Sequence, residues 1–416
     1  MKKLTTLILL TAIAAISGIE AKAQSVNVVS VSEKNDQHNF YSIMKGAFPL
    51  AYNDPAAPRF IFFDKDKKFL FGIGGYVQAT GVYDFNGVPN YNDFTTSTID
   101  PKGHQGGGSY GFTIGQSRLF FKLVGDTKVG RLISYMEMEF EGPSQTPQLN
   151  QAFVQFKGFT IGKAWSTFTD MPALPTTIDE EGPSGAIAVR QPQIRYTYKF
   201  NPKWQASLAL EYVVPDYTDQ PDNYTSTIRQ RIPDIPLAVK YSFKNGGHLQ
   251  GAAILRNIYY KDNIKDKDRV TTGWGTTISG EIPLCKKTSF MFQGVYGKGI
   301  ANYIQDMSSL GYDLVPSTSQ EGRLKATGMW GFFGALQQNW SENFYSSVVY
   351  SYARIENIGS MPTTNYKYAQ YAGVNLLWNF TEYGTTGIEY LYGRRNNFDK
   401  EYGNASRINM MVQYRF

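Results

Sequence analysis

The last nine residues of the chain alternate between apolar and polar side chains. From Ile408 to Phe416 every even-numbered position is apolar, and most odd-numbered positions are polar. Alternation over about ten residues is typical of a β-strand that has one face in lipid and the other in a polar lumen. The pattern therefore predicts a strand that crosses a membrane as part of a closed β-sheet.

The same alternation recurs upstream. Along residues 131–141 the apolar side chains share one face, and the acids Glu137, Glu139 and Glu141 share the other. A basic residue on the lipid face of a barrel costs about 2–4 kcal/mol near the midplane, and an acid costs somewhat less. The three carboxylates are therefore expected to face the lumen. Residues 191–200 alternate in the same way.

Read along the whole chain, the pattern predicts about sixteen strands, an even number as in single-chain bacterial barrels. The predicted strands are 69–84, 110–124, 129–141, 149–157, 159–165, 189–200, 203–213, 235–244, 248–259, 270–283, 288–298, 324–338, 343–355, 367–380, 384–395 and 404–416. The predicted fold class is all-β, a transmembrane antiparallel β-barrel.

Connector lengths support this fold independently. Every second connector is tight, as at Asn201-Pro202 and Asn245-Gly246-Gly247, and the intervening ones are mostly long. Bacterial outer-membrane barrels have short periplasmic turns and longer extracellular loops, whereas a soluble sandwich has no reason to keep this parity. The long connectors are 85–109, 166–188, 214–234, 260–269 and 299–323.

Residues 1–23 have the features of an export signal. Lys2 and Lys3 precede a short apolar run, and Ala21-Lys22-Ala23 has the small-x-small pattern of a cleavage site. We expect the mature chain to start at Gln24, with a short periplasmic segment over 24–68 before a barrel over 69–416. A C-terminal Phe resembles the sorting signal of outer-membrane barrels, so the outer membrane is the expected location and its lipid an expected partner.

Composition excludes several classes of protein. Cys285 is the only cysteine, so no intrachain disulfide can form. The net charge of +6 is a weak excess without a basic cluster, which argues against nucleic acid as a partner. The aromatic content of 15% suits the girdles of a membrane barrel, but it also fits a secreted carbohydrate-binding sandwich.

The connector 166–188 is the candidate constriction loop. It contains Pro172, Pro175 and Pro183, and the acidic run Asp179-Glu180-Glu181. Proline cannot donate to a strand ladder, so this segment is a loop rather than a strand. Its composition is compatible both with folding into the lumen and with a solvated external loop.

Several motifs between about 112 and 200 resemble the DcaP-like porins. They are Gln116-Ser117-Arg118-Leu119-Phe120-Phe121-Lys122, Gly162-Lys163-Ala164-Trp165-Ser166-Thr167-Phe168, Asp170, Pro175, Thr177-Ile178-Asp179, Gly182-Pro183 and Arg190-Gln191-Pro192-Gln193-Ile194-Arg195-Tyr196-Thr197. The resemblance implies a homotrimer of sixteen-stranded barrels with the third loop folded inward. It also implies passive diffusion of small hydrophilic solutes, with a preference for small anions such as dicarboxylates.

The resemblance places basic residues at the constriction. The matching pore-lining positions are Arg118, Arg190 and Arg195, with Lys122 and Lys163 nearby. Arginine suits this role because its charge is permanent and its planar fork pairs with carboxylates. A structural role is equally open, in which these arginines tether the loop acids Asp170, Asp179, Glu180 and Glu181. Residues 24–68 show no sustained heptads, so no trimerising coiled coil is expected there.

Other functions find less support in the residues. The three histidines have no metal-ligand spacing and no predictable Ser or Asp partner, so neither an enzyme nor a metal or other cofactor is expected. The six tryptophans could stack on sugars in a carbohydrate receptor or adhesin, although most lie near predicted strand ends, where they anchor barrels at the interface. A sealed structural barrel remains an alternative, and would need 85–109 and 166–188 to plug it.

Overall fold

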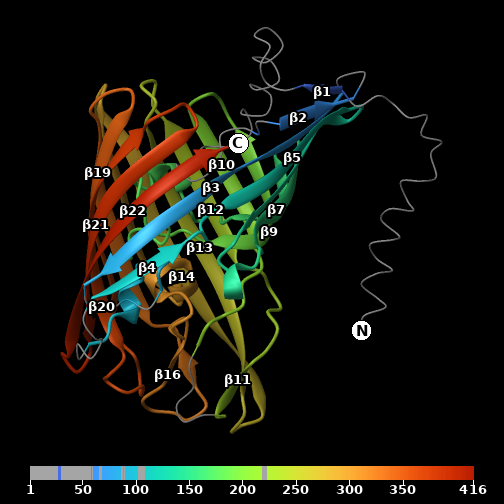
Figure 1. Ribbon diagram of the computed structural model, residues 1–416. Coiled ribbons are helices and arrows are strands. Elements are labelled where there is room, and N and C mark those ends of the chain that lie inside the picture. The colour runs from blue at the N-terminus through green and yellow to red at the C-terminus, as the bar shows by residue number, and fades with distance from the viewer. Residues whose placement is uncertain are drawn as a thin grey trace.

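Sixteen antiparallel strands in the described part of the chain close into a barrel, as the sequence predicts (Figure 1). The computed structural model describes residues 27–29, 58, 60–64, 68–85, 88, 90–101, 108–217 and 223–416. The expected export signal 1–23 lies outside the described residues, as does most of the expected periplasmic segment 24–68.

The strands of the barrel wall follow one another in chain order. They are β3 (Phe69–Asp84), β4 (Ser109–Thr113) continued by β5 (Arg118–Thr127), β6 (Gly130–Glu139), β7 (Gln148–Phe156), β8 (Phe159–Trp165), β9 (Arg190–Lys199), β10 (Trp204–Glu211), β12 (Ile235–Ser242), β13 (His248–Asp262), β14 (Lys267–Cys285), β15 (Thr288–Lys298), β18 (Gly328–Asn339), β19 (Phe344–Ile355), β20 (Tyr366–Asn379), β21 (Gly384–Asn397) and β22 (Tyr402–Arg415).

The ring closes between its first and last strands. β22 pairs with β3 in a register that runs from Tyr76 opposite Arg415 to Asp84 opposite Arg407. At one end of this seam, the short strand β2 (Phe60–Phe63) pairs with the first residues of β3, and β1 (Asn27–Val29) pairs with β2.

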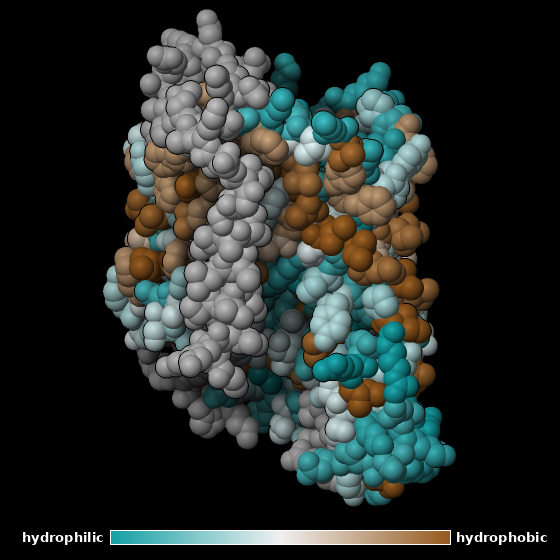
Figure 2. Space-filling model, turned by 90° about the vertical axis from the view of Figure 1, so that its right-hand side faces the viewer, coloured by the Kyte–Doolittle hydropathy of each residue, from teal (hydrophilic) through white to brown (hydrophobic). Residues whose placement is uncertain are grey.

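Alternation along each strand sorts side chains to the two faces of the wall. In β10, Leu208 and Leu210 are about half exposed (52% and 46%), whereas Ala209 and Glu211 are buried (1% and 0%). Figure 2 shows hydrophobic side chains gathered in a belt across the strands, above a hydrophilic end. No helix in the described residues is long and apolar enough to cross a bilayer.

Tight turns gather at the end of the barrel where the C-terminus lies, and longer loops at the other end (Figure 1). We name three of the longer loops L1 (85–108), L3 (166–189) and L6 (299–327). The remaining short elements lie in loops: β11 (Thr225–Thr227), β16 (Val315–Pro316), β17 (Leu324–Lys325), η1 (Thr96–Thr98), η2 (Pro143–Gln145), η3 (Met171–Ala173), η4 (Ala301–Tyr303) and η5 (Gln305–Met307).

Two details differ from the sequence prediction. The expected loop 260–269 is a projecting hairpin, because β13 and β14 stay paired up to Asp262 and Lys267. An ion pair between Arg269 and Asp262 (2.7 Å) stabilises it. The expected strand 110–124 is interrupted between β4 and β5, where the Ser117 amide donates to the Ile114 carbonyl (3.0 Å) instead of to β3.

Candidate functional site

L3 enters the lumen and is fixed at its start by a buried aspartate. Asp170, just before η3, receives the Lys240 ammonium of β12 (3.0 Å) on Oδ1. Its Oδ2 accepts from the Ser279 hydroxyl of β14 (2.7 Å) and contacts His248 Nε2 of β13 (2.8 Å). Asp170 therefore ties L3 to three neighbouring strands.

The centre of L3 crosses the lumen to the far wall. Glu389 of β21 accepts the backbone amides of Ile178 (2.9 Å) and Asp179 (2.7 Å) on its two carboxylate oxygens. The Asp179 side chain in turn accepts the Phe94 amide of L1 (2.8 Å) and the Tyr371 hydroxyl of β20 (3.1 Å). Hydrogen bonds to charged groups are stronger than neutral ones, so this part of the loop is held firmly.

The end of L3 packs directly against β18 and β19. The Gly185 amide donates to the Ser351 hydroxyl (2.8 Å). A Cβ at Gly185 would lie 2.5 Å from the Tyr352 carbonyl oxygen, and one at Gly331 would lie 3.0 Å from Gly185 Cα. A larger side chain at either position would clash, so glycine at both positions allows the loop to lie this close to the wall.

L1 and L6 also fold into the lumen, although the sequence singled out only 85–109 and 166–188 as segments that could fill it. The Asp306 carboxylate of η5 accepts the Ser97 amide of η1 (2.8 Å), and the Gln305 amide donates to the Ala186 carbonyl of L3 (2.9 Å). The apolar residues Tyr303, Ile304 and Met307 of L6 are fully buried in a cluster with L3 and the wall. Their burial is the physical reason that this loop turns inward.

These loops leave a cavity of about 200 Å³ against the wall formed by β5, β6, β8 and β9, which we call the eyelet. The charged side chains that line the eyelet are Asp93, Arg118, Glu139, Glu141, Glu180, Glu181 and Arg190. L1, the end of β6, L3 and the wall each contribute charges, and the acids outnumber the arginines.

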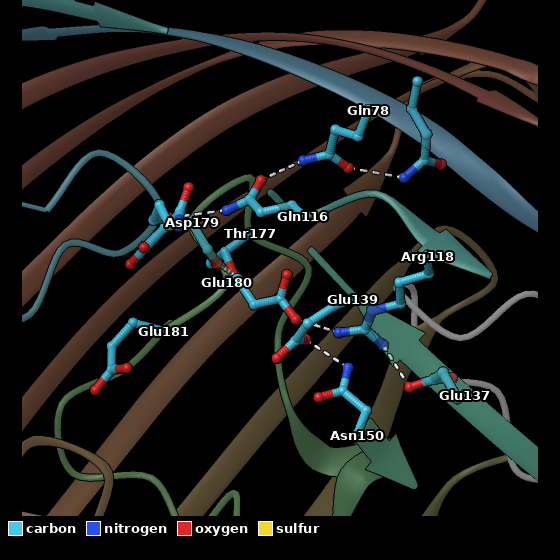
Figure 3. Close-up of polar contacts among 12 residues, drawn as sticks. Gln78, Gln116, Arg118, Glu137, Glu139, Asn150, Thr177, Asp179, Glu180 and Glu181 are labelled. Atoms are coloured by element: carbon cyan, nitrogen blue, oxygen red, sulfur yellow. Dashed lines mark hydrogen bonds and ion pairs between the residues drawn. The ribbon is translucent and has the colours of Figure 1, made fainter. Parts of the chain in front are cut away.

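Arg118 is the central cation of the eyelet. Its guanidinium pairs with Glu137 (3.4 Å) on the neighbouring strand and with Glu180 of L3 (Figure 3). Glu139, beside Glu137 on β6, accepts a hydrogen bond from the Asn150 amide. The contact between Arg118 and Glu180 joins the wall to L3, so this arginine both lines the cavity and tethers the loop.

Arg190 occupies a different setting. It stands opposite Trp165 in the β8–β9 pair, and its guanidinium lies 3.9 Å from the centre of the indole ring. Its Nε atom is buried without a hydrogen-bond partner. The guanidinium of Arg190 is held by stacking on the indole ring, and Arg190 lines the eyelet.

The other basic residues named from the sequence do not line the eyelet. The Lys163 ammonium donates to the Leu149 carbonyl (2.8 Å), and the Arg195 guanidinium donates to the Trp165 carbonyl (3.1 Å). Lys122 is buried on the lumen side of β5. Of the predicted loop acids, Glu180 and Glu181 line the eyelet, whereas Asp170 and Asp179 anchor L3.

Sequence reasoning missed Asp93, which L1 brings to the eyelet. Burial and the negative charges of Asp179 and Glu180 raise the pKa of Asp93 to about 7. Burial, with the charges of Asp93 and Asp179, also raises the pKa of Glu181 well above its usual range. Residues 85–108 are mostly polar, so nothing in the sequence of L1 indicates that Asp93 enters the lumen.

A second cavity of about 980 Å³ lies on the other side of L3. Its lining includes Glu281, Lys287 and Trp340, at the end of the barrel that carries the tight turns. Met171 and Leu174 of L3 line both this cavity and the eyelet. The two cavities therefore meet at these two apolar side chains.

The described residues hold no arrangement suited to catalysis or metal binding. His248 does meet a serine and an aspartate, but Asp170 stands between the other two and contacts both, so His248 does not activate Ser279 as a base would. No group of three or more His, Cys, Asp or Glu side chains in the described ranges could hold a metal ion.

Comparison with known protein families identifies the kind of protein to which this chain belongs. The family description "Porin subfamily" matches residues 22–413. The chain belongs to the porin subfamily. This porin is a channel of the bacterial outer membrane and not an enzyme, as the sequence predicts. No curated protein matches it.

Solved structures share its fold. The outer membrane channel DcaP of Acinetobacter baumannii matches with a TM-score of 0.74 at 19% identity, over 85% of this chain and 99% of that one. An anion-selective porin from Comamonas acidovorans matches with a TM-score of 0.55 at 10% identity, over 84% and 100%. OmpT, an outer membrane protein of Vibrio cholerae, matches with 0.53 at 10%, over 84% and 98%. The predicted resemblance to DcaP-like porins is confirmed.

Proposed function

We propose that small hydrophilic solutes diffuse through the eyelet of this porin and that Arg118 and Arg190 favour small anions such as dicarboxylates. The observation that carries the proposal is the cavity of about 200 Å³ between L3 and the wall, which is lined by both guanidinium groups. Pockets of about 300–1,000 Å³ accommodate drug-sized ligands, so a cavity of this size suits smaller solutes.

The electrostatics of the eyelet determine how strongly anions are favoured. The guanidinium groups keep their charge at every physiological pH. The raised pKa values of Asp93 and Glu181 mean that these acids carry less than their full negative charge near neutrality. Arg190, which forms no ion pair within the described part of the chain, is the stronger candidate for contact with a passing carboxylate.

Single-channel recording under a KCl gradient tests this function. We expect stepwise conductance and a reversal potential that favours chloride, and Arg190→Gln should move that potential toward potassium. Arg231→Gln is the matched control, because Arg231 is an exposed loop residue that pairs with Asp268 at the exposed start of β14. Folded protein that inserts but carries no current would refute the open pore and would favour a sealed barrel with a surface binding role.

A homotrimer is the assembly that we propose for this porin. The strands β5 to β8 have 10, 10, 9 and 7 residues, against 15 and 19 for β13 and β14. Their outer face bears a hollow of about 690 Å³ lined by apolar residues such as Phe121, Met136 and Ile161. A short, hollowed wall is better covered by a neighbouring subunit than by lipid tails. Cross-linking in detergent should trap a species of three chains, and Met136→Glu should abolish it.

A further inference from the structure

Most of the charges that line the eyelet are not ion-paired. Arg118 and Glu180 neutralise each other, and Glu139 is hydrogen-bonded to Asn150. Arg190, Asp93, Glu141 and Glu181 also line the cavity, yet none of them has an ion-pair partner among the described residues.

The unpaired charges of opposite sign belong to different elements. Arg190 lies on the β8–β9 wall, stacked on Trp165. The three acids come from L1, from the residues after β6, and from L3. In Figure 3, the neighbours Glu180 and Glu181 point in different directions, with Glu180 directed to Arg118 and Glu181 directed away from it. The cavity therefore presents one unpaired cation and a group of unpaired acids on other elements. Burial raises the pKa of Asp93 to about 7 and that of Glu141 to about 10, so the negative charge of this group near neutrality comes chiefly from Asp93.

A charge in a confined, poorly hydrated space is costly unless an opposite charge accompanies it. A solute that carries only carboxylates would satisfy Arg190. It would, however, meet the partial negative charge of Asp93 and the carboxyl oxygens of Glu141 and Glu181. A solute that carries only an amine would satisfy the acids but would leave the guanidinium without a partner. A small molecule that carries both groups satisfies both sides of the cavity at once.

We propose that the solutes this eyelet favours are small zwitterions that bear an ammonium and a carboxylate group, such as the smaller amino acids. This inference rests on the proposed passage of solutes through the eyelet, and it goes beyond the anion preference by predicting that an ammonium group adds to the attraction of Arg190 for a carboxylate.

The test compares three solutes of nearly equal size in liposomes that contain the purified full-length protein. Alanine is a zwitterion, lactamide is its uncharged isomer, and lactate is the corresponding anion. Rates of entry are measured by liposome swelling, and the rates of protein-free liposomes are subtracted. We expect alanine to enter about two- to fivefold faster than lactamide or lactate, the range expected of a solvent-accessible ion pair.

A double variant assigns the preference to the eyelet. Asp93→Asn combined with Glu181→Gln should bring the ratio of alanine entry to lactamide entry down to about one. Glu281→Gln is the control, because Glu281 lines the larger cavity beyond L3. It should leave the alanine preference intact.

The outcomes distinguish failure of the zwitterion preference from failure of the proposed pore. If lactamide enters but alanine enters no faster, the zwitterion preference is wrong and the pore stands. If lactate enters fastest, the eyelet is a simple anion filter and the inference is overturned. If none of the three enters through correctly folded protein, the proposed function fails and the inference fails with it.

Discussion

The anchoring of L3 on Glu389 gives the sharpest test of the structure. Replacing Glu389 with Gln keeps the size of the side chain and one acceptor oxygen, but it turns the other oxygen into a donor that faces a backbone amide. One of the bonds to Ile178 (2.9 Å) and Asp179 (2.7 Å) must then be lost. A hydrogen bond to a charged group contributes about 1.5–3 kcal/mol. The undocked population of L3 should therefore rise about 10- to 100-fold, at 1.4 kcal/mol for each factor of ten.

Two measurements report on this change. Single-channel traces of Glu389→Gln should show frequent transitions to a higher conductance, and limited proteolysis should cut within residues 166–189 faster than in the unaltered protein. Glu382→Gln is the control, because Glu382 is exposed in the turn before β21. If the Glu389→Gln channel showed no more transitions and no faster proteolysis than the control, L3 would be held by its other contacts and our reasoning about Glu389 would be refuted.

Three further predictions follow from the eyelet and its surroundings. Leu174→Ala should raise single-channel conductance, because Leu174 lines both cavities; an unchanged conductance would place the route elsewhere. Raising the pH from about 6 to about 8 should lower the chloride-to-potassium permeability ratio, measured from reversal potentials, because the carboxyl of Asp93, with its pKa of about 7, gains negative charge over this range. Asp93→Asn should remove that part of the pH dependence. Arg118→Ala should lower the free energy of unfolding by about 3–5 kcal/mol, since it leaves buried acids without their partner. Unfolding in guanidinium chloride measures this loss, and Arg131→Ala, at an exposed ion pair, should cost less than about 1 kcal/mol.

The barrel itself could be predicted from the sequence because the alternation of apolar and polar side chains can be recognised within each strand separately. Successive residues of a strand point alternately to lipid and to lumen, so an odd or even position within the strand determines the face. Leu208 and Glu211 can therefore be assigned to opposite faces without knowledge of the rest of the fold. All sixteen predicted strands overlap strands of the structure. The interruption between β4 and β5 escaped prediction because it depends on how residues 114–117 pack against L1 and β3.

The site was less predictable because its contacts join distant parts of the chain. The Ser97 amide and Asp306 are 209 residues apart in sequence, and the partners Arg118 and Glu180 are 62 apart. Parity places Arg118 in the lumen, but it cannot say which acid will reach it. For Lys163, alternation along β8 places the side chain on the outer face with Phe159 and Ile161 (43% and 52% exposed), so the sequence pattern argued against the pore position that the resemblance implied.

Closure of the ring between β3 and β22 has a consequence for how the molecule comes apart. Arg407 reaches back across 323 positions to Asp84, with its Nε and Nη2 atoms 2.8 and 2.9 Å from the two carboxylate oxygens. In an open sheet a terminal strand can peel away by breaking one ladder, but in a ring every strand has a neighbour on each side. Fraying therefore has no favoured starting strand, and removing any one strand breaks two ladders at once. We expect the wall to resist heat and detergent as a single cooperative unit while its loops are cut or exchanged, which makes loops rather than strands the natural places for change in this molecule.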